Sequence, residues 1–283
     1  MLSARIAYCG NVEARVRSRI HVRCFAKISS SVPPFSAVKF PAPEPGGYGE
    51  ISYWDKRYAE QPDATLDWFS DYSRFEPIVR KHIPKSSRVL MAGCGNSAMS
   101  NDMVEDGYQE IVNTDLSSVV IDNFKARYAH VPQLSYVAID SRDMSAFQDC
   151  SFDAVIDKGL ADAMLCNLRS FFQCGVDPAE GVLQMLRETY RILRPQGVFM
   201  LITYGHPEIR MPALLEPGLK WSILLYALAK PGTEKAVMET IEGVTPDSLP
   251  IDERNWSLGL EDFGGDKGMT FVYVCSKPNE RDK

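Results

Sequence analysis

Short apolar runs alternate with amphipathic stretches from residue 75 to residue 203, and this alternation dominates the pattern of the chain. Apolar runs of five or six residues between polar turns predict buried strands, whereas apolar positions that recur every three or four residues predict helices. The predicted strands are 87–92, 110–114, 134–139, 152–157 and 198–203. The predicted helices are 75–82, 97–106, 117–128 and 178–193. Because strands alternate with helices, we predict an α/β fold with a parallel sheet and right-handed crossovers.

The regular alternation stops after residue 203. Two further strand-like runs, 221–229 and 270–276, are separated by residues 230–269, which are rich in Gly, Pro and acidic residues. No strong helical pattern lies between the two runs, so we expect an added strand pair that can be antiparallel. We expect the long intervening segment to hold little regular structure.

An aromatic stretch precedes the first predicted strand. Trp54 and Tyr58 lie four residues apart, which places both rings on one face of a helix, and Trp68 follows ten residues later. Two interpretations are open for these rings. They can cover an edge of the hydrophobic core, or they can form a lid over a ligand pocket.

Composition narrows the class of protein. The chain has 283 residues, 45% hydrophobic and 24% charged, with a formal net charge of −6. No apolar run approaches the ~20 residues that span a membrane, and an acidic chain is not expected to bind nucleic acid broadly. Seven cysteines without a C-x-x-C pair indicate reduced thiols and neither a disulfide framework nor a zinc site. We therefore expect a monomer that contains no metal and has no membrane or nucleic-acid partner.

The first forty residues differ in composition from the rest. They contain five Arg, two Lys and six Ser against a single acid, Glu13. An Arg-rich, Ser-containing and acid-poor start is typical of an organelle transit peptide, although a disordered tail or a mis-assigned start would look similar. We therefore expect residues 1–47 to be a transit-like or disordered segment with a Pro-rich linker, and residues 48–283 to be the folded domain. The protein is then mitochondrial or chloroplastic if the segment is a transit peptide, and cytoplasmic otherwise.

Two glycines follow the first predicted strand of the alternating region. Gly93 and Gly95 end the apolar run 88–92 and precede a helical pattern, as in a tight turn that leads into a helix N-terminus. Glycine lets the backbone approach a ligand closely, because a Cβ atom would collide with it. Asp115 lies twenty residues after Gly95, at the end of the next predicted strand, where a carboxylate can accept hydrogen bonds from ribose hydroxyls. These features predict a nucleoside-containing cofactor.

The third predicted strand discriminates between cofactors. The G-x-G-x-x-A pattern at residues 93–98 also matches a dinucleotide fingerprint, but that signal alone is weak. Asp140 and Ser141 end the third strand, where the acid can accept from the adenine amine and the next backbone N–H can donate to the adenine ring. No His, Lys and Tyr set typical of hydride transfer is visible. One ribose acid and one adenine acid on successive strands favour S-adenosylmethionine.

This arrangement resembles the class I (seven-β-strand) S-adenosylmethionine-dependent methyltransferases over residues 88–203. The resemblance implies a Rossmann-like three-layer sandwich with a mostly parallel seven-stranded sheet, ordered 3-2-1-4-5-7-6, whose last strand is antiparallel. The sequence departs from the family pattern at Met91, where an acid is common, and at Ser97, where a third glycine is common.

Five motifs in order extend the resemblance to the methyltransferase-like 13 group, which includes lysine methyltransferases acting on elongation factor 1-alpha. The motifs are Tyr53–Tyr58, Asp67–Phe69, Gly93–Ser97, His130–Leu134 and Phe152–Gly159. The resemblance covers residues 48–205, and later segments at 201–205 and 272–275 resemble plant members.

The resemblance implies a set of cofactor contacts. Three aromatic residues lie over the methionine end, the glycine turn passes close to the ligand, and two strand-end acids address ribose and adenine. The implied cofactor-binding residues are Trp54, Tyr58, Trp68, Gly93, Gly95, Asp115, Leu116, Asp140, Ser141 and Lys158. The group usually has Asp-Lys-Gly-Thr-Leu-Asp where this chain has Leu160 and Ala161 after Gly159, and this departure bears on the choice of substrate.

Methyl transfer from a sulfonium is an in-line displacement that depends mainly on positioning the nucleophile. A lysine acceptor must be neutral to attack, and a nearby carboxylate or phenol can orient it. The candidate catalytic residues are Asp157, Asp162 and Tyr204, but Asp157 can instead cap a helix, Asp162 can face solvent and Tyr204 can belong to the core. We predict a methyltransferase acting on a lysine of a protein such as an elongation factor. The alternatives are an organellar small-molecule methyltransferase and a non-catalytic S-adenosylmethionine-binding module.

Overall fold

The computed structural model describes residues 47–166, 178–229, 248–254, 256–263 and 268–279, and the following account concerns these residues. Of the predicted transit-like segment, only Gly47 is among the described residues. Residues 230–247 of the predicted irregular segment also lie outside the described residues. Within the described part of the chain, no helix is long and apolar enough to cross a membrane.

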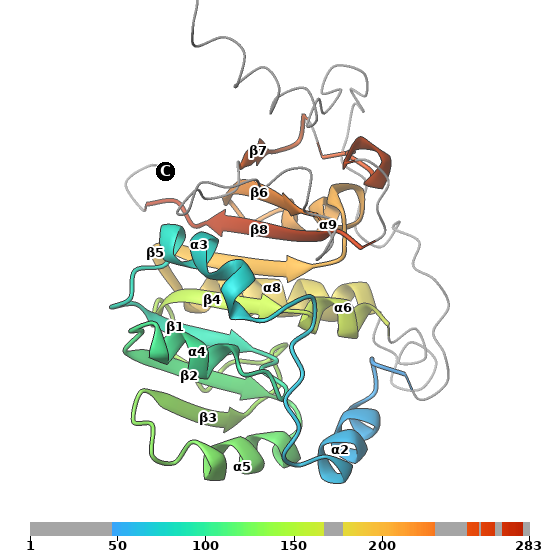
Figure 1. The fold of residues 1–283 in the computed structure, drawn as a ribbon. Helices are drawn as coiled ribbons and strands as arrows, with labels where there is room; N and C mark the ends of the chain where they lie inside the picture. The colour runs from blue at the N-terminus through green and yellow to red at the C-terminus, as the bar shows by residue number, and fades with distance from the viewer. Residues whose placement is uncertain (1–46, 167–177, 230–247, 255, 264–267, 280–283) are drawn as a thin grey trace, which may run out of the picture.

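An eight-stranded sheet runs through the protein in the order β3-β2-β1-β4-β5-β8-β6-β7 (Figure 1). The strands are β1 (Arg88–Ala92), β2 (Glu110–Asp115), β3 (Leu134–Ala138), β4 (Phe152–Lys158), β5 (Leu193–Thr203), β6 (Ser222–Leu228), β7 (Leu249–Ile251) and β8 (Thr270–Ser276). The first five pair in parallel, and β8, β6 and β7 pair antiparallel.

The predicted order of seven strands is confirmed, since β8 lies between β5 and β6 and runs antiparallel to both. The short strand β7 is an addition on the outer edge of β6, inside the segment expected to hold little regular structure. A three-residue strand has too few positions to show a period in the sequence, so β7 becomes visible only through its pairing with β6 in the structure.

Helices cover both faces of the sheet, as Figure 1 shows, and this confirms the three-layer sandwich. The helices are α2 (Ile51–Glu60), α3 (Tyr72–His82), α4 (Met99–Glu105), α5 (Ser118–Arg127), α6 (Leu160–Leu165), α8 (Pro178–Ile192) and α9 (Pro207–Leu214), with a 3-10 turn η3 (Leu260–Phe263). Alternate residues of β1 enter two separate cores: Val89 and Met91 pack with α3, α4 and α5, whereas Leu90 and Ala92 pack with α6, α8 and α9.

Two boundaries differ from the predictions for local reasons. Helix α3 begins at Tyr72 because Asp71 caps it, accepting a 3.1 Å hydrogen bond from the Ser73 N–H. Strand β5 begins at Leu193, which pairs with Phe152 across a β-bulge, so it starts five residues before the predicted strand 198–203. The short helices α6 and α9 were not predicted.

All five parallel strands end at one edge of the sheet. Figure 1 shows α2 and α6 at this edge, beside the carboxyl ends of β1, β2 and β4. Ligands of open α/β sheets bind outside the carboxyl ends of the strands, so this edge is where the predicted site residues can meet.

Candidate active site

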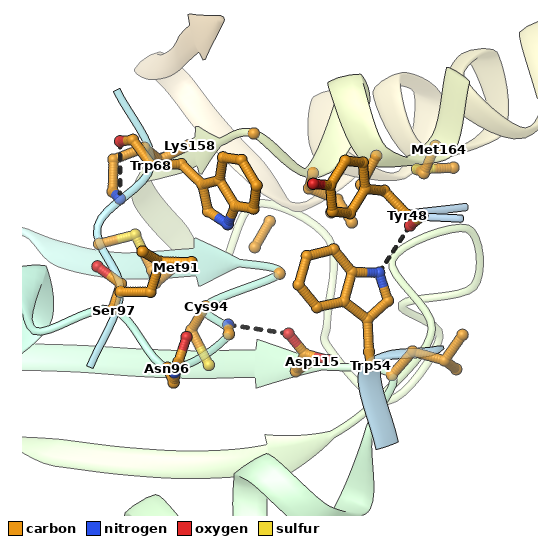
Figure 2. Close-up of a pocket in the computed structure, with 18 of the residues that line it drawn as sticks. Tyr48, Trp54, Trp68, Met91, Cys94, Asn96, Ser97, Asp115, Lys158 and Met164 are labelled. Atoms are coloured by element: carbon orange, nitrogen blue, oxygen red, sulfur yellow. Dashed lines mark hydrogen bonds between the residues drawn. The ribbon is translucent and has the colours of Figure 1, made fainter. Parts of the chain in front are cut away.

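A cleft of about 900 Å³, open to solvent, lies at the carboxyl ends of β1, β2 and β4. It is covered by residues of α2 and of the connection between α2 and α3, as Figure 2 shows for Trp54 and Trp68. Eight of the ten predicted cofactor residues line it: Trp54, Tyr58, Trp68, Gly93, Gly95, Asp115, Leu116 and Lys158. The tertiary structure therefore brings together residues that lie more than one hundred positions apart in the chain.

The glycine turn has the left-handed backbone that glycine permits. Gly93 has φ of 61° and Gly95 has φ of 51°. A Cβ atom on Gly93 would lie 2.8 Å from Cβ of Leu160, and one on Gly95 would lie 3.0 Å from the hydroxyl of Tyr58. In the structure, the atoms that crowd both positions belong to the protein, so the glycines allow α6 and α2 to close on the turn.

Asp115 is fixed at the end of β2 by backbone donors. Its Oδ2 accepts a 2.9 Å hydrogen bond from the Gly95 N–H, and its Oδ1 accepts a 2.9 Å bond from the Ser117 N–H. Burial raises the pKa of Asp115 above its ordinary value, while these hydrogen bonds oppose the shift. A carboxylate has about four acceptor positions, so the held group can still accept from a ligand hydroxyl in the cleft.

The aromatic residues form one connected cluster over the cleft mouth. Trp54 stacks on Tyr58 with ring centroids 5.7 Å apart and donates from Nε1 to the Tyr48 carbonyl at 2.6 Å. Tyr48 in turn packs edge-on against Trp68 at 5.3 Å (Figure 2). Both interpretations of these rings hold in part, because Tyr58 belongs to a buried core cluster and the same rings line the cleft.

Lys158 ends β4 with its side chain in the cleft wall. The ammonium donates to Asp67 Oδ1 at 3.0 Å and to the Trp68 carbonyl at 3.3 Å. Its side chain is only 5% exposed, and burial lowers the pKa of Lys158 while Asp67 opposes that shift. The lysine therefore connects the sheet to the cover of the cleft.

Asp140 and Ser141 are the two predicted cofactor residues outside the cleft lining. The Asp140 carboxylate accepts from the Arg142 N–H at 2.9 Å and from Nη2 of Arg142 at 2.6 Å. Burial opposes ionisation, but the hydrogen bonds from Arg142 outweigh it and hold the pKa of Asp140 below its ordinary value. Their adenine contacts stay a prediction.

The three predicted catalytic residues are not among the residues that line the cleft. Asp157 is fully buried and caps α6, accepting from Leu160 N–H at 2.7 Å and from Ala161 N–H at 3.0 Å. Burial, with a smaller contribution from Asp162, raises the pKa of Asp157 to about 7. The capping interpretation of Asp157 therefore describes its contacts, and its catalytic role stays a prediction.

Asp162 and Tyr204 lie together beside the ends of β4 and β5. Asp162 Oδ1 accepts from Arg210 Nη2 at 3.0 Å and from the Tyr204 N–H at 3.4 Å. The Tyr204 ring is 49% exposed and packs edge-on against Phe69 at 4.5 Å. Tyr204 is therefore a surface residue and does not belong to the core, which was the alternative to its catalytic role. Asp162 is paired with Arg210, whereas the alternative placed it free in solvent.

Several cleft residues were missed in the sequence. They are Tyr48, Gly49, Ile51, Leu66, Met91, Ala92, Cys94, Asn96, Ser97, Gly159, Leu160, Ala163 and Met164. Leu160, Ala163 and Met164 have the spacing of one helix face, but α6 is too short for that spacing to be distinctive. Asp67 was also missed as a site residue, although it stands in the Asp67–Phe69 motif next to Trp68.

Comparison with known proteins agrees with this geometry. Residues 90–201 match the family model described as "Methyltransferase domain". The chain is 36% identical over 178 residues to EEF1A lysine methyltransferase 4 of Bos taurus, covering 62% of this chain and 69% of that protein. It is 33% identical over 172 residues to the eEF1A lysine and N-terminal methyltransferase of Homo sapiens, covering 59% of this chain but 23% of that protein.

A solved structure supports the fold alone. The structure described as "Conversion of a Disulfide Bond into a Thioacetal Group during Echinomycin Biosynthesis" matches with a TM-score of 0.50 at 17% identity, covering 81% of this chain and 93% of that chain. The sheet order, the cleft at its carboxyl edge and the two sequence relationships agree with one another. The chain belongs to the class I S-adenosylmethionine-dependent methyltransferases, in the group of EEF1A lysine methyltransferases.

Proposed function

We propose that this enzyme methylates a lysine side chain of a protein, and that the protein is elongation factor 1-alpha. The observation that carries the proposal is the 36% identity to the bovine EEF1A lysine methyltransferase 4, of which the chain covers 69%. Methyltransferases of one fold act on many acceptors, so the substrate rests on this relationship and not on the sheet topology.

The residues of the cleft suit S-adenosylmethionine in chemistry. Asp115 and Lys158 provide an anionic and a cationic group among the residues that line the cleft. The rings of Trp54 and Trp68 offer faces that attract a cation such as a sulfonium. The bound cofactor would supply a methyl group on a sulfonium sulfur.

The cleft wall would favour the neutral form of an acceptor amine. Leu160, Ala163 and Met164 form an apolar stripe of α6 beside the glycine turn. An apolar environment lowers the pKa of an amine because it disfavours the charged form. The stripe would therefore help a lysine side chain lose its proton before it attacks.

Among the three candidate residues, Tyr204 has the contacts that suit an orienting role. Its ring is half exposed, whereas both Asp157 oxygens accept bonds from the backbone of α6. The bond from the Tyr204 N–H to Asp162 and the contact with Phe69 hold the phenol near the end of β5. We therefore infer that Tyr204 orients the acceptor amine.

The test of the function is transfer of a tritiated methyl group from S-adenosylmethionine to purified elongation factor 1-alpha, with the modified residue located by mass spectrometry. We expect label on a lysine of the factor, and no label when that lysine is replaced by arginine. Label found only in the small-molecule fraction of an extract would support the small-molecule alternative, and cofactor binding without transfer would support the non-catalytic module.

The role of Tyr204 has its own test in the variant Tyr204→Phe. General acid–base groups contribute roughly 10²–10⁴-fold, and an orienting hydroxyl is expected at or below the lower end, so we expect kcat to fall about tenfold or more while cofactor affinity stays unchanged. The matched control is Tyr128→Phe, since Tyr128 follows the last residue of α5, stacks on Tyr136 and does not line the cleft. An unchanged kcat in Tyr204→Phe would contradict this role.

A further inference from the structure

Asp67 joins three parts of the cleft through one carboxylate. It lies between α2 and α3 and accepts hydrogen bonds from the Ser97 hydroxyl, from the Ala98 N–H at 3.3 Å and from the Lys158 ammonium at 3.0 Å. Ser97 and Ala98 immediately precede α4, whereas Lys158 ends β4. The carboxylate therefore bridges the glycine turn and the neighbouring strand.

Lys158 is the only basic residue among the described residues that line the cleft. Its side chain is 5% exposed and that of Asp67 is 15% exposed, so water screens the pair weakly. A buried ammonium without a partner tends to lose its proton. Asp67 is the charged group that faces this ammonium within the described structure, and its attraction favours the charged form.

Hydrogen bonds also fix the position of the Lys158 ammonium. Two of its hydrogen bonds go to the cover of the cleft, one to Asp67 and one to the carbonyl of Trp68. An ammonium has three donors, so the third is available to a ligand in the cleft. The next residue, Phe69, has φ of 71°, a left-handed conformation that is costly for a residue with a Cβ atom. This conformation directly follows the two residues that Lys158 bonds.

We propose that Asp67 is a positioning residue, which keeps the Lys158 ammonium charged and directed into the cleft so that it binds the carboxylate at the amino-acid end of the cofactor. The proposal rests on the assignment of the cleft as the S-adenosylmethionine site. It separates two contributions to cofactor affinity. Asp115 and the aromatic rings would serve the nucleoside and sulfur, whereas Asp67 would act through Lys158 on the carboxylate.

Two ligands distinguish these contributions by calorimetry. S-adenosylhomocysteine carries the amino-acid carboxylate, and 5′-methylthioadenosine has the nucleoside and sulfur without it. We expect Asp67→Asn to weaken the affinity for S-adenosylhomocysteine about 10- to 100-fold, which is the contribution of a hydrogen bond to a charged group. The affinity for 5′-methylthioadenosine should stay within about twofold of that of the parent enzyme. Asp63→Asn is the matched control, because Asp63 lies on the same connection with a fully exposed side chain.

Two further variants test that Asp67 acts through Lys158. Lys158→Met should show the same selective loss of S-adenosylhomocysteine, and the double variant Asp67→Asn with Lys158→Met should lose no more than Lys158→Met alone. The affinity of Asp67→Asn should also decline at a lower pH than that of the parent enzyme, because the ammonium without its partner loses its proton earlier.

An equal loss of both ligands in Asp67→Asn would overturn the proposal and show that Asp67 only supports the fold. Unchanged affinity for both ligands would also overturn it. Failure of the parent enzyme to bind either ligand would refute the cofactor site itself, and the positioning role with it, which distinguishes that result from the other two. Melting temperatures of all variants show whether each protein is folded.

Discussion

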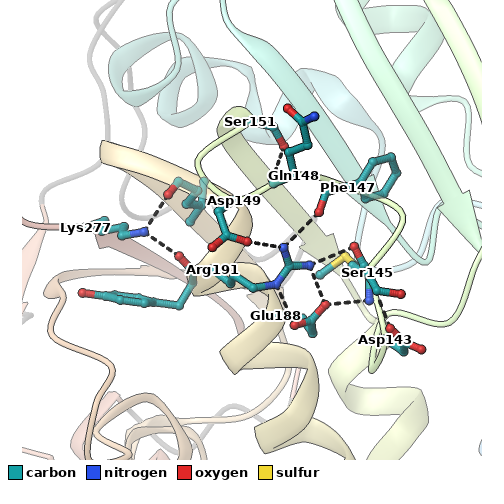
Figure 3. A network of polar contacts seen from close by, with 12 residues as sticks. Asp143, Ser145, Phe147, Gln148, Asp149, Ser151, Glu188, Arg191 and Lys277 are labelled. Atoms are coloured by element: carbon teal, nitrogen blue, oxygen red, sulfur yellow. Dashed lines mark hydrogen bonds and ion pairs between the residues drawn. The ribbon is translucent and has the colours of Figure 1, made fainter.

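The cleft edge of the sheet and the opposite edge use charged side chains in different ways. At the opposite edge, Arg191 lies in the last turn of α8, and Figure 3 shows its guanidinium surrounded by acceptors from α8 and from the segment before β4. All five of its N–H donors are used: two go to Glu188, one to Asp149 and two to the carbonyls of Met144 and Phe147. Lys158 in the cleft donates two bonds to the cover of the cleft.

This difference teaches how to separate a structural ion network from a binding group. A saturated guanidinium has no donor left for a ligand, so its contacts serve only to join segments. Figure 3 also shows Lys277 donating to the carbonyls of Tyr190 and Leu193, each at 2.7 Å, which ties the end of α8 to the chain after β8. Charges at this edge join segments of the fold, whereas we propose that Asp115 and Lys158 at the cleft edge bind a ligand.

The largest expected effect is on stability at the saturated edge. Arg191→Met should lower the free energy of unfolding by about 3 kcal/mol, because Glu188 and two carbonyls lose charged hydrogen bonds, while affinity for S-adenosylhomocysteine stays within about twofold. Chemical denaturation and calorimetry measure the two quantities. The control is Arg187→Met, an exposed ion pair on the same helix, for which ~1 kcal/mol or less is expected. A large loss of ligand affinity in Arg191→Met would break the comparison.

The next effect lies at the cleft edge, where we expect a larger loss of ligand affinity than of stability. Asp115→Asn should weaken binding of 5′-methylthioadenosine by roughly 2 kcal/mol, or about 30-fold, because a charged acceptor for the ribose is lost. The free energy of unfolding should fall less, by about 1 kcal/mol, because the asparagine keeps one acceptor for the turn while its NH2 group loses the other backbone hydrogen bond. Asp122→Asn, an exposed acid of α5, serves as the control. Unchanged affinity would show that Asp115 does not contact the nucleoside.

The pH dependence of stability tests a third group, the buried carboxyl of Asp157 beside the cleft. The pKa of Asp157 is raised to about 7 in the folded enzyme, whereas it is near 3.9 in an unfolded chain. The folded state therefore holds this proton more tightly, so its stabilising contribution is complete below about pH 4. The contribution is lost as the pH rises through the folded value near 7.

Asp157→Asn removes this titration and should flatten the pH dependence of the free energy of unfolding between about pH 4 and 7, by at most ~1.4 kcal/mol per pH unit. Urea denaturation at several pH values measures it. Parallel profiles for the variant and the parent enzyme would show that Asp157 is ionised in the folded state across this range.

The smallest effect is expected from Gly95→Ala. Its left-handed backbone costs an alanine roughly 1–2 kcal/mol, and the added Cβ would lie 3.0 Å from the Tyr58 hydroxyl. Because α2 carries Tyr58 and can shift outward, we expect about 1 kcal/mol lower stability together with weaker cofactor binding. A thermal melt and a ligand titration measure both. A stability loss without any change in affinity would show that Gly95 supports the fold and does not contribute to ligand binding.

Much of the fold was predictable because each main strand and helix has its own local pattern. The strand 270–276 was predicted with the bounds that β8 has, and 110–114 falls one residue short of β2. The elements that were missed, α6, α9 and β7, are eight residues or shorter. Elements of this length carry too few positions for a period to stand out, and neighbouring elements decide whether they form.

Residues of the cleft were predictable where a strand end or a glycine turn marked them, as at Asp115 and Gly95. The partners of those residues were not predictable. No local pattern relates Asp67 to Lys158, which stand ninety-one positions apart, or Asp162 to Arg210. Such pairs form only when parallel strands bring their carboxyl ends to one edge of the sheet.

Local patterns in the chain thus specify the order of strands and helices, the glycine turn and the acid at the end of β2, because backbone propensity and short-range periodicity act within about twenty residues. Packing of the sheet specifies which charges are saturated and which face a ligand. Arg191 and Lys158 are both basic residues at the end of an element, and the sequence alone does not distinguish them. Their roles differ because the number and placement of acceptors around a buried cation depend on segments far away in the chain.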